Sequence, residues 1–285
     1  MRICRTIASL RRALSAPIPG RGRVGFVPTM GFLHEGHLSL VRASRRENDL
    51  TVVSIFVNPS QFAPGEDLRR YPRDPRRDAA ALRREGVDIL FIPGDAEMYP
   101  KTFRTWVDVT ELDDKLCGRT RPGHFRGVAT VVLKLFHLVR PQRAYFGMKD
   151  AQQGLVIRQM IRDLDLSVRL RVLPIVRDAD GLALSSRNVY LSAEERVAAL
   201  ALPKALRRAR RLIEGGERDA RALRAAMRAE ISLQPLLAID YIAVVRLDDL
   251  EETAQIEPGN TLVAVAVRAG RTRLIDNYLS GEIKC

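Results

Sequence analysis

The sequence of 285 residues has few cysteines and no long apolar run, and both absences limit what the protein can be. Cys4, Cys117 and Cys285 form no CxxC pair and leave an odd thiol under any pairing, which favours a reducing compartment. Arginines interrupt every apolar run near the N-terminus, so no secretory signal is predicted. The best membrane candidate, residues 128–139, is too short and contains a lysine and a histidine. We therefore expect a cytoplasmic protein with no membrane segment.

Lysine is also scarce. The formal net charge is +13, and nearly all of the basic residues are arginines. The densest basic segment, residues 204–230, interleaves arginine with alanine and leucine at helical spacing, which is typical of solvated helix faces. No aromatic RNA-binding motif or zinc-finger spacing accompanies this charge. We therefore expect no nucleic-acid partner, although the positive charge would suit small anionic substrates.

Short β-rich runs alternate with helical patterns up to residue 176. Apolar residues make up 46% of the chain, which is enough for a large buried core. The strand-like runs are residues 24–28, 51–57, 87–92, 144–146 and 169–176, and the helical runs are residues 38–48, 78–86, 128–139 and 151–164. Strands that are nearly all apolar, each followed by a helix, indicate an α/β fold with a parallel sheet covered on both faces.

The pattern changes after this region. Ser192 and Glu195 form a capping box that begins a helix, in which Pro203 predicts a kink or a restart. Three strand-like runs follow at residues 240–247, 261–267 and 272–279. We therefore predict an α/β domain at residues 1–176 and a smaller α+β domain with antiparallel pairing at residues 177–285.

Two histidines, His34 and His37, stand in the segment PTMGFLHEGH, directly after the first of these strands. As metal ligands they would lack a third partner nearby, and Gly36 would weaken a helix that carried both. A packing or capping role for either histidine is the other ordinary interpretation. A phosphate site fits more observations, because Gly31 and Gly36 allow backbone N–H groups to approach a ligand at a helix N-terminus. Imidazoles can donate further hydrogen bonds to phosphate oxygens.

Three later segments carry polar residues close to predicted strand ends. FVNPSQF (residues 56–62) and FGMKDAQQ (residues 146–153) follow strands, and GLALSSRN (residues 181–188) precedes the second domain. Each segment alone is explained by a turn, a solvated first helical turn or an N-cap. Together with the histidine segment they indicate one site, because ligands of parallel sheets bind at the carboxyl ends of the strands.

These motifs, together with RPGHFRGVATVV at residues 121–132, resemble the pantothenate synthetase (pantoate–β-alanine ligase) family, in the same order and over most of the chain. This family belongs to the nucleotidylyltransferase superfamily. The resemblance implies a Rossmann-like N-terminal domain, a smaller C-terminal lid and a cytoplasmic homodimer. It also implies an ATP-dependent ligase that joins pantoate and β-alanine through a pantoyl adenylate and releases AMP and pyrophosphate.

The resemblance also assigns roles to individual residues. His37 would be the catalytic proton donor, Gln61 and Gln153 would bind pantoate, and Gln61 would also contact β-alanine. The implied ATP-binding residues are Met30, Gly31, Phe32, Leu33, His34, Glu35, Gly36, His37, Gly147, Met148, Lys149, Asp150, Val176, Leu184, Ser185, Ser186 and Arg187. Met148 and Leu184 depart from the family pattern, which commonly has an acidic residue and a methionine there.

Mg²⁺ is implied as a cofactor, and we expect the ATP phosphates to be its main ligands. Asp74 and Asp78 offer carboxylates, but they do not align as a metal-binding pair, so protein ligands of the metal stay unassigned. Two other functions stay open from the sequence. Another adenylyl or cytidylyl transferase would use a phosphate oxygen as the nucleophile. An RNA-binding protein derived from a synthetase fold would bind RNA without ATP turnover.

Overall fold

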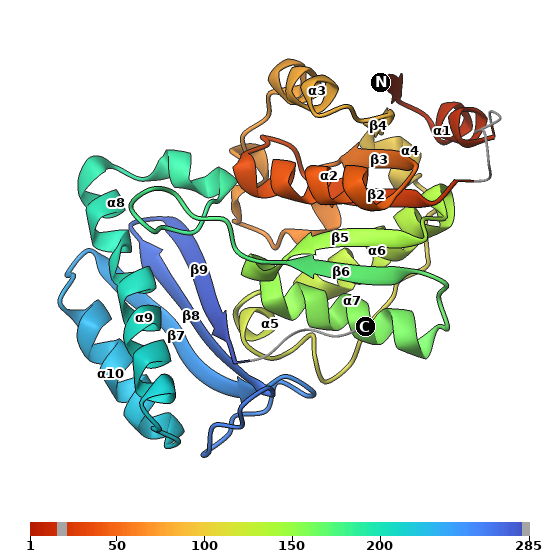
Figure 1. Ribbon diagram of the computed structural model, residues 1–285. Coiled ribbons are helices and arrows are strands. Elements are labelled where there is room, and N and C mark those ends of the chain that lie inside the picture. Colours follow the sequence, from red (N-terminus) through yellow and green to blue (C-terminus); the bar gives the residue numbers. More distant parts are fainter. Residues whose placement is uncertain (16–21, 281–285) are drawn as a thin grey trace. The chain divides into compact units, whose positions relative to one another are not determined.

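The computed structural model describes residues 1–15 and 22–280. The contacts between residues divide the chain into two compact units. The first unit comprises Met1–Gly147 and Val156–Leu173, and the second comprises Met148–Leu155 and the described residues 174–280. Each unit has its own sheet (Figure 1).

The first unit contains a six-stranded parallel sheet in the order β1-β4-β3-β2-β5-β6 (Figure 1). The strands are β1 (Arg2–Cys4), β2 (Val24–Thr29), β3 (Leu50–Ile55), β4 (Ile89–Phe91), β5 (Arg143–Gly147) and β6 (Arg169–Leu173). The predicted parallel α/β fold is therefore confirmed. β1 was not predicted, because its three residues are too few to show a periodic pattern.

Helices cover both faces of this sheet. The helices up to the end of β5 are α1 (Ile7–Leu14), α2 (Glu35–Glu47), α3 (Pro75–Arg84), α4 (Asp95–Met98), α5 (Cys117–Thr120) and α6 (His124–Val139). They are followed by α7 (Ala151–Asp163), whose residues up to Leu155 belong to the second unit. Val27 of β2 packs in one buried core with Val41 of α2 and Leu82 of α3. Its neighbour Phe26 meets Phe136 of α6, with ring centroids 6.4 Å apart. Because successive strand residues point to opposite faces, α2 and α3 lie on one face and α6 on the other.

The second unit has a three-stranded antiparallel sheet, as the sequence predicts. It consists of β7 (Leu237–Arg246), β8 (Thr261–Ala269) and β9 (Thr272–Leu279), with the helices α8 (Ala193–Ala199), α9 (Ala201–Glu214) and α10 (Ala220–Ser232). Leu206 of α9, Leu223 of α10 and Val265 of β8 share one buried core. Pro203 lies in the first turn of α9, so it marks a restart rather than a kink.

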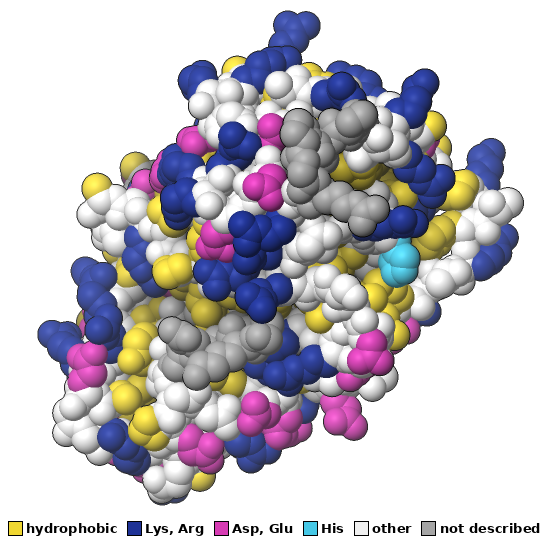
Figure 2. Space-filling model, turned by 45° about the vertical axis from the view of Figure 1, so that its right-hand side comes forward, with side chains coloured by type: hydrophobic (Ala, Val, Ile, Leu, Met, Phe, Trp, Pro, Cys, Tyr) yellow, Lys and Arg dark blue, Asp and Glu magenta, His cyan; other side chains and the backbone are white. Residues whose placement is uncertain are grey.

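Basic side chains lie on the protein surface, and the two cysteines among the described residues form no disulfide. Lys and Arg side chains are spread over the face shown in Figure 2, and acidic side chains stand among them. In the basic segment of α9 and α10, Arg207, Arg208 and Arg228 are exposed, as expected of solvated helix faces. Cys4 and Cys117 are buried free thiols, whereas Cys285 lies outside the described residues. Among the described helices, none has the length and apolar character needed to cross a membrane.

Candidate active site

The turn after β2 has an unusual backbone. Gly31 and Phe32 both adopt positive φ angles, of 85° and 49°, which residues other than glycine rarely do. The hydroxyl of Thr29 donates to the carbonyl oxygen of Ser54 at 2.7 Å and accepts from the backbone N–H of Gly31 at 3.2 Å. The end of β3 therefore helps to fix the start of this turn.

A buried carboxylate holds the same turn from the other side. Asp78 of α3 accepts hydrogen bonds from the backbone N–H groups of Phe32, at 2.7 Å, and Leu33, at 2.8 Å. Burial raises the pKa of Asp78, and the two backbone hydrogen bonds oppose that shift. Both oxygens of this carboxylate are thus engaged with the backbone. Within residues 1–15 and 22–280 no group of three or more His, Cys, Asp or Glu residues could hold a metal ion.

The two histidines lie side by side at the N-terminus of α2. His34 is the N-cap residue, and its carbonyl oxygen accepts from the backbone N–H of His37 at 2.8 Å. The backbone N–H of His34 donates in turn to Nδ1 of His37 at 3.4 Å, and the two ring centroids are 4.1 Å apart. If Nδ1 of a neutral His37 accepts, Nε2 carries the proton. The arrangement presents two imidazoles and the positive end of a helix together.

The segment after β3 lies against this turn. Asn58 is 1% exposed, and its amide nitrogen donates to the side-chain oxygen of Gln61 at 3.2 Å and to the carbonyl oxygen of Gly127 at 3.0 Å. The amide nitrogen of Gln61 lies 3.0 Å from the sulfur of Met30. Of the predicted site residues, Met30 and Gln61 are therefore brought into contact, although 31 residues separate them in the sequence.

A charged network fixes the backbone of Gln61. His124 donates from Nδ1 to the carbonyl oxygen of Gln61 at 2.8 Å, and Arg121 contacts Nε2 of His124 at 3.0 Å. Arg121 also makes two hydrogen bonds of 2.7 Å to the carboxylate of Glu66. Burial on its own would raise the pKa of Glu66, but the hydrogen bonds and charge of Arg121 hold it below its usual value. The sequence leaves His124 unassigned, and its contact with Gln61 supports a positioning role.

Gly127 explains how α6 comes so close to this segment. A Cβ atom at this position would lie 2.5 Å from the carbonyl oxygen of Ser60 and 2.8 Å from Cα of Gln61. Only glycine fits there without a shift of the backbone. The sequence did not predict this role, because a glycine inside a helical pattern does not show which other segment packs against it.

In the second unit, the residues that precede α7 are held by β9. Met148, Lys149 and Asp150 form a short 3₁₀ helix, in which Nζ of Lys149 lies 3.6 Å from the carboxylate of Asp150. The buried side chain of Asn277 donates to the carbonyl oxygens of Met148, at 2.9 Å, and Lys149, at 3.0 Å. Gln153, in the first turn of α7, is half-buried. Asn277 was not predicted from the sequence, since polar residues are ordinary in a strand at a sheet edge.

The remaining predicted ATP-binding residues form one hairpin in the second unit. The backbone N–H of Leu184 donates to the carbonyl oxygen of Val176 at 3.0 Å. Ser185 then caps a 3₁₀ helix by accepting from the backbone N–H of Arg187 at 3.3 Å, and Ser186 is buried. The hairpin thus brings Val176 beside the serine–arginine segment.

The comparisons with known proteins agree with one another. A family model described as pantoate-beta-alanine ligase matches residues 2–279. A pantothenate synthetase of Roseiflexus sp. (strain RS-1) is 57% identical over 277 residues, covering 97% of this chain and 98% of the relative. A pantothenate synthetase of Thermotoga neapolitana is 53% identical, covering 99% of this chain and 100% of the relative.

Two solved structures resemble the whole chain. A pantothenate synthetase of Thermus thermophilus has a TM-score of 0.93 and 49% sequence identity, covering 99% of this chain and 100% of that one. A pantoate-beta-alanine ligase of Francisella tularensis, complexed with beta-gamma ATP and beta-alanine, has a TM-score of 0.81 and 32% identity, covering 98% of both chains.

Asp78→Asn should destabilise the first unit. The amide nitrogen cannot accept a hydrogen bond, so one of the N–H groups of Phe32 and Leu33 loses its partner, at a cost of about 1–3 kcal/mol. Urea denaturation would measure this loss. Asp74→Asn is the matched control, because Asp74 is an N-cap residue that accepts from the backbone N–H of Arg77, and asparagine caps helices equally well. Equal stability of Asp78→Asn and the wild type would contradict the structural role of Asp78.

Glu66→Gln should lower the melting temperature at pH 7 but not in acid. The folded-state pKa of Glu66 lies below the reference value of 4.5, so its ionised form stabilises the folded state above that pH. This contribution is lost as the pH falls through the folded-state pKa. We expect a deficit of about 2–4 °C at neutral pH, for a loss near 1 kcal/mol. The deficit should shrink as the pH falls below 4.5 and disappear once Glu66 is protonated in the folded state, and a constant deficit would contradict the ion-pair explanation.

Proposed function

The chain belongs to the pantoate–β-alanine ligase family, and we propose that it joins pantoate to β-alanine with ATP. The observation that supports this function most directly is the pair of imidazoles at the N-terminus of α2, with Gln61 in contact with the same turn. The turn offers donors to an anionic ligand, and the side chain beside it offers an amide. The ATP and β-alanine bound by the Francisella relative support both compounds as ligands.

The proposed first step is attack of the pantoate carboxylate on the α-phosphorus of ATP, which gives pantoyl adenylate and pyrophosphate. Negative charge then grows on the phosphoryl oxygens and on the leaving group. We assign His37 as the proton donor to these oxygens, since its Nε2 carries the proton when Nδ1 accepts from His34. Lys149 and Arg187 are proposed to bind phosphate oxygens as well, and the other residues that the family resemblance assigns to ATP are proposed to line the ATP site, with Val176 at the adenine. Donors that are already in place stabilise this charge without reorganising.

The proposed pantoate-binding residues are Gln61 and Gln153. A neutral amide both donates and accepts, so it can orient a hydroxy acid without the strong ion pair that arginine would make with the nucleophilic carboxylate. Gln61 suits this role because it is buried and its backbone is fixed by His124 and Arg121. In the second step the β-alanine amine attacks the activated carbonyl, and AMP leaves. Gln61 is proposed to contact β-alanine too.

Mg²⁺ fits this site as part of the ATP complex rather than as an ion held by the protein. The donors near the turn are imidazoles and backbone N–H groups, which suit anions, and the carboxylate of Asp78 is already engaged. When bound, the ion would neutralise phosphate charge. A homodimer and a cytoplasmic location are further proposals, which rest on the family resemblance.

Replacing His37 by alanine should lower kcat by about 100-fold or more, because the residue is proposed to stabilise charge that forms in the transition state. Steady-state assays of pantothenate formation would measure the loss. His137→Ala is the matched control, since His137 is exposed on α6, and it should leave kcat unchanged. A folded His37→Ala enzyme with wild-type turnover would rule out the assignment.

The order of the two steps can be tested with isotopes. No side chain of the site is proposed as a covalent nucleophile, so labelled pyrophosphate should enter ATP when pantoate is present and β-alanine is absent. Oxygen-18 from the pantoate carboxylate should appear in AMP after turnover. The second candidate function, transfer of a nucleotide to a phosphate acceptor, would instead leave no AMP.

Two results would contradict this order. Exchange of pyrophosphate without pantoate would indicate an adenylylated enzyme, for which Lys149 is the first nucleophile to test. Release of ADP and phosphate would indicate an acyl phosphate instead of an acyl adenylate.

A further inference from the structure

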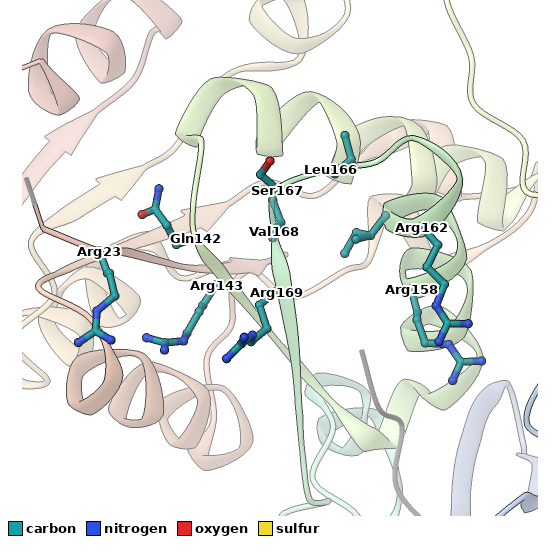
Figure 3. Close-up of a pocket in the computed structure, with 10 residues that line it drawn as sticks. Arg23, Gln142, Arg143, Arg158, Arg162, Leu166, Ser167, Val168 and Arg169 are labelled. Carbon is teal, nitrogen blue, oxygen red and sulfur yellow. The ribbon is translucent and has the colours of Figure 1, made fainter.

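A pocket of about 510 Å³ lies in the first unit at the amino ends of three adjacent strands (Figure 3). Arg23 precedes β2, Arg143 begins β5 and Arg169 begins β6. Arg143 and Arg169 are register partners, so their backbones are neighbours in the sheet. In Figure 3 these three guanidinium groups gather on one side of the pocket, and Arg158 and Arg162 of α7 stand on the other.

The positive charge of this pocket is balanced by little negative charge. None of the residues that line it is acidic. An adjoining hollow of about 350 Å³ shares Arg23, Arg143 and Arg169, and its only acidic lining residue is Glu47. That carboxylate is already 3.0 Å from Arg171 and 4.0 Å from Arg143. One carboxylate therefore faces several arginines.

A purely structural role accounts for only part of this arrangement. Arg143 donates to the carbonyl oxygen of Glu47 at 2.5 Å, and cations are favourable at such a helix C-terminus. In contrast, the exposed side chains of Arg23, Arg162 and Arg169 make no hydrogen bond or ion pair with residues 1–15 or 22–280. Like charges on neighbouring strands destabilise a sheet, and a bound anion would offset that cost.

We propose that this pocket binds a small organic anion that carries two or more phosphate groups or several carboxylates. Guanidinium groups pair with the oxygens of either group through two parallel hydrogen bonds. Ile161, Leu166 and Val168 supply apolar lining for the carbon skeleton of the ligand. The volume lies in the range of small-molecule sites.

The pocket is distinct from the candidate active site. Arg23 lies just before β2, whereas the turn that leads to His34 and His37 lies just after it. A strand of six residues spans roughly 20 Å, which separates the two places. The proposal therefore does not depend on the ligase function. It also gives part of the net charge of +13 a specific role.

Calorimetric titration at low ionic strength would test the proposal, with fructose 1,6-bisphosphate as the phosphate probe and citrate as the carboxylate probe. We expect the wild type to bind at least one of them, and the tighter one identifies the ligand class. The double variant Arg23→Gln/Arg169→Gln should weaken binding by about tenfold or more, because two charge-assisted contacts are lost. Its ligase activity without the probe should equal that of the wild type.

The matched control is Arg208→Gln/Arg228→Gln, which removes the same charge from exposed positions in the second unit. It should change the dissociation constant by no more than about twofold, because neither arginine lines the pocket and only the net charge changes. Equal weakening in both double variants would show an effect of net charge alone and overturn the proposal, as would binding of neither probe at millimolar concentration. Should the first double variant fail to fold, Arg162→Gln alone must weaken binding while the control does not.

Discussion

The candidate active site depends on the hydrogen bonds from two backbone N–H groups to the carboxylate of Asp78. A left-handed conformation at a residue other than glycine costs roughly 1–2 kcal/mol, and Phe32 adopts one. The hydrogen bonds that Asp78 accepts from Phe32 and Leu33 offset this cost. Arg77 adds to them, since its guanidinium group lies over the ring of Phe32 and donates to the carbonyl oxygen of Leu33. The direction in which α2 begins therefore follows from a side chain of α3.

The parallel sheet also places the segment that follows β3 next to this turn. Thr29 and Ile55 are register partners at the ends of β2 and β3, so the segments that follow both strands start at the same edge. Met30 and Gln61 meet there. Because residue 127 is glycine, α6 packs closely against the segment that follows β3. That segment therefore has buried partners on both sides. Backbone geometry and a few side-chain hydrogen bonds thus position a polar amide that could not otherwise be held in a buried place.

The sequence predicts most of the fold and places the candidate site residues near strand ends, but it does not predict the interactions that hold the candidate site in shape. Apolar periodicity is a local signal, so it identified the longer strands and helices and the segments that follow them. Asp78 and Asn277 escaped this reasoning, because their backbone partners lie 45 and 128 residues away in the sequence. A hydrogen bond from a side chain to a distant backbone group has no period and no fixed spacing. Asp78 could be noticed in the sequence only as a carboxylate available to a metal.

The two edges of the parallel sheet differ in the donors that they can offer to an anion. At the carboxyl edge α2 begins, so backbone N–H groups and the imidazoles of His34 and His37 can donate hydrogen bonds to an anion. At the amino edge the same helix ends, and its carbonyl groups repel anions. Side chains with a permanent positive charge can offset this repulsion, and the arginines provide that charge. Arg143 compensates the end of α2, and the exposed guanidinium groups of Arg23, Arg162 and Arg169 are left for a ligand.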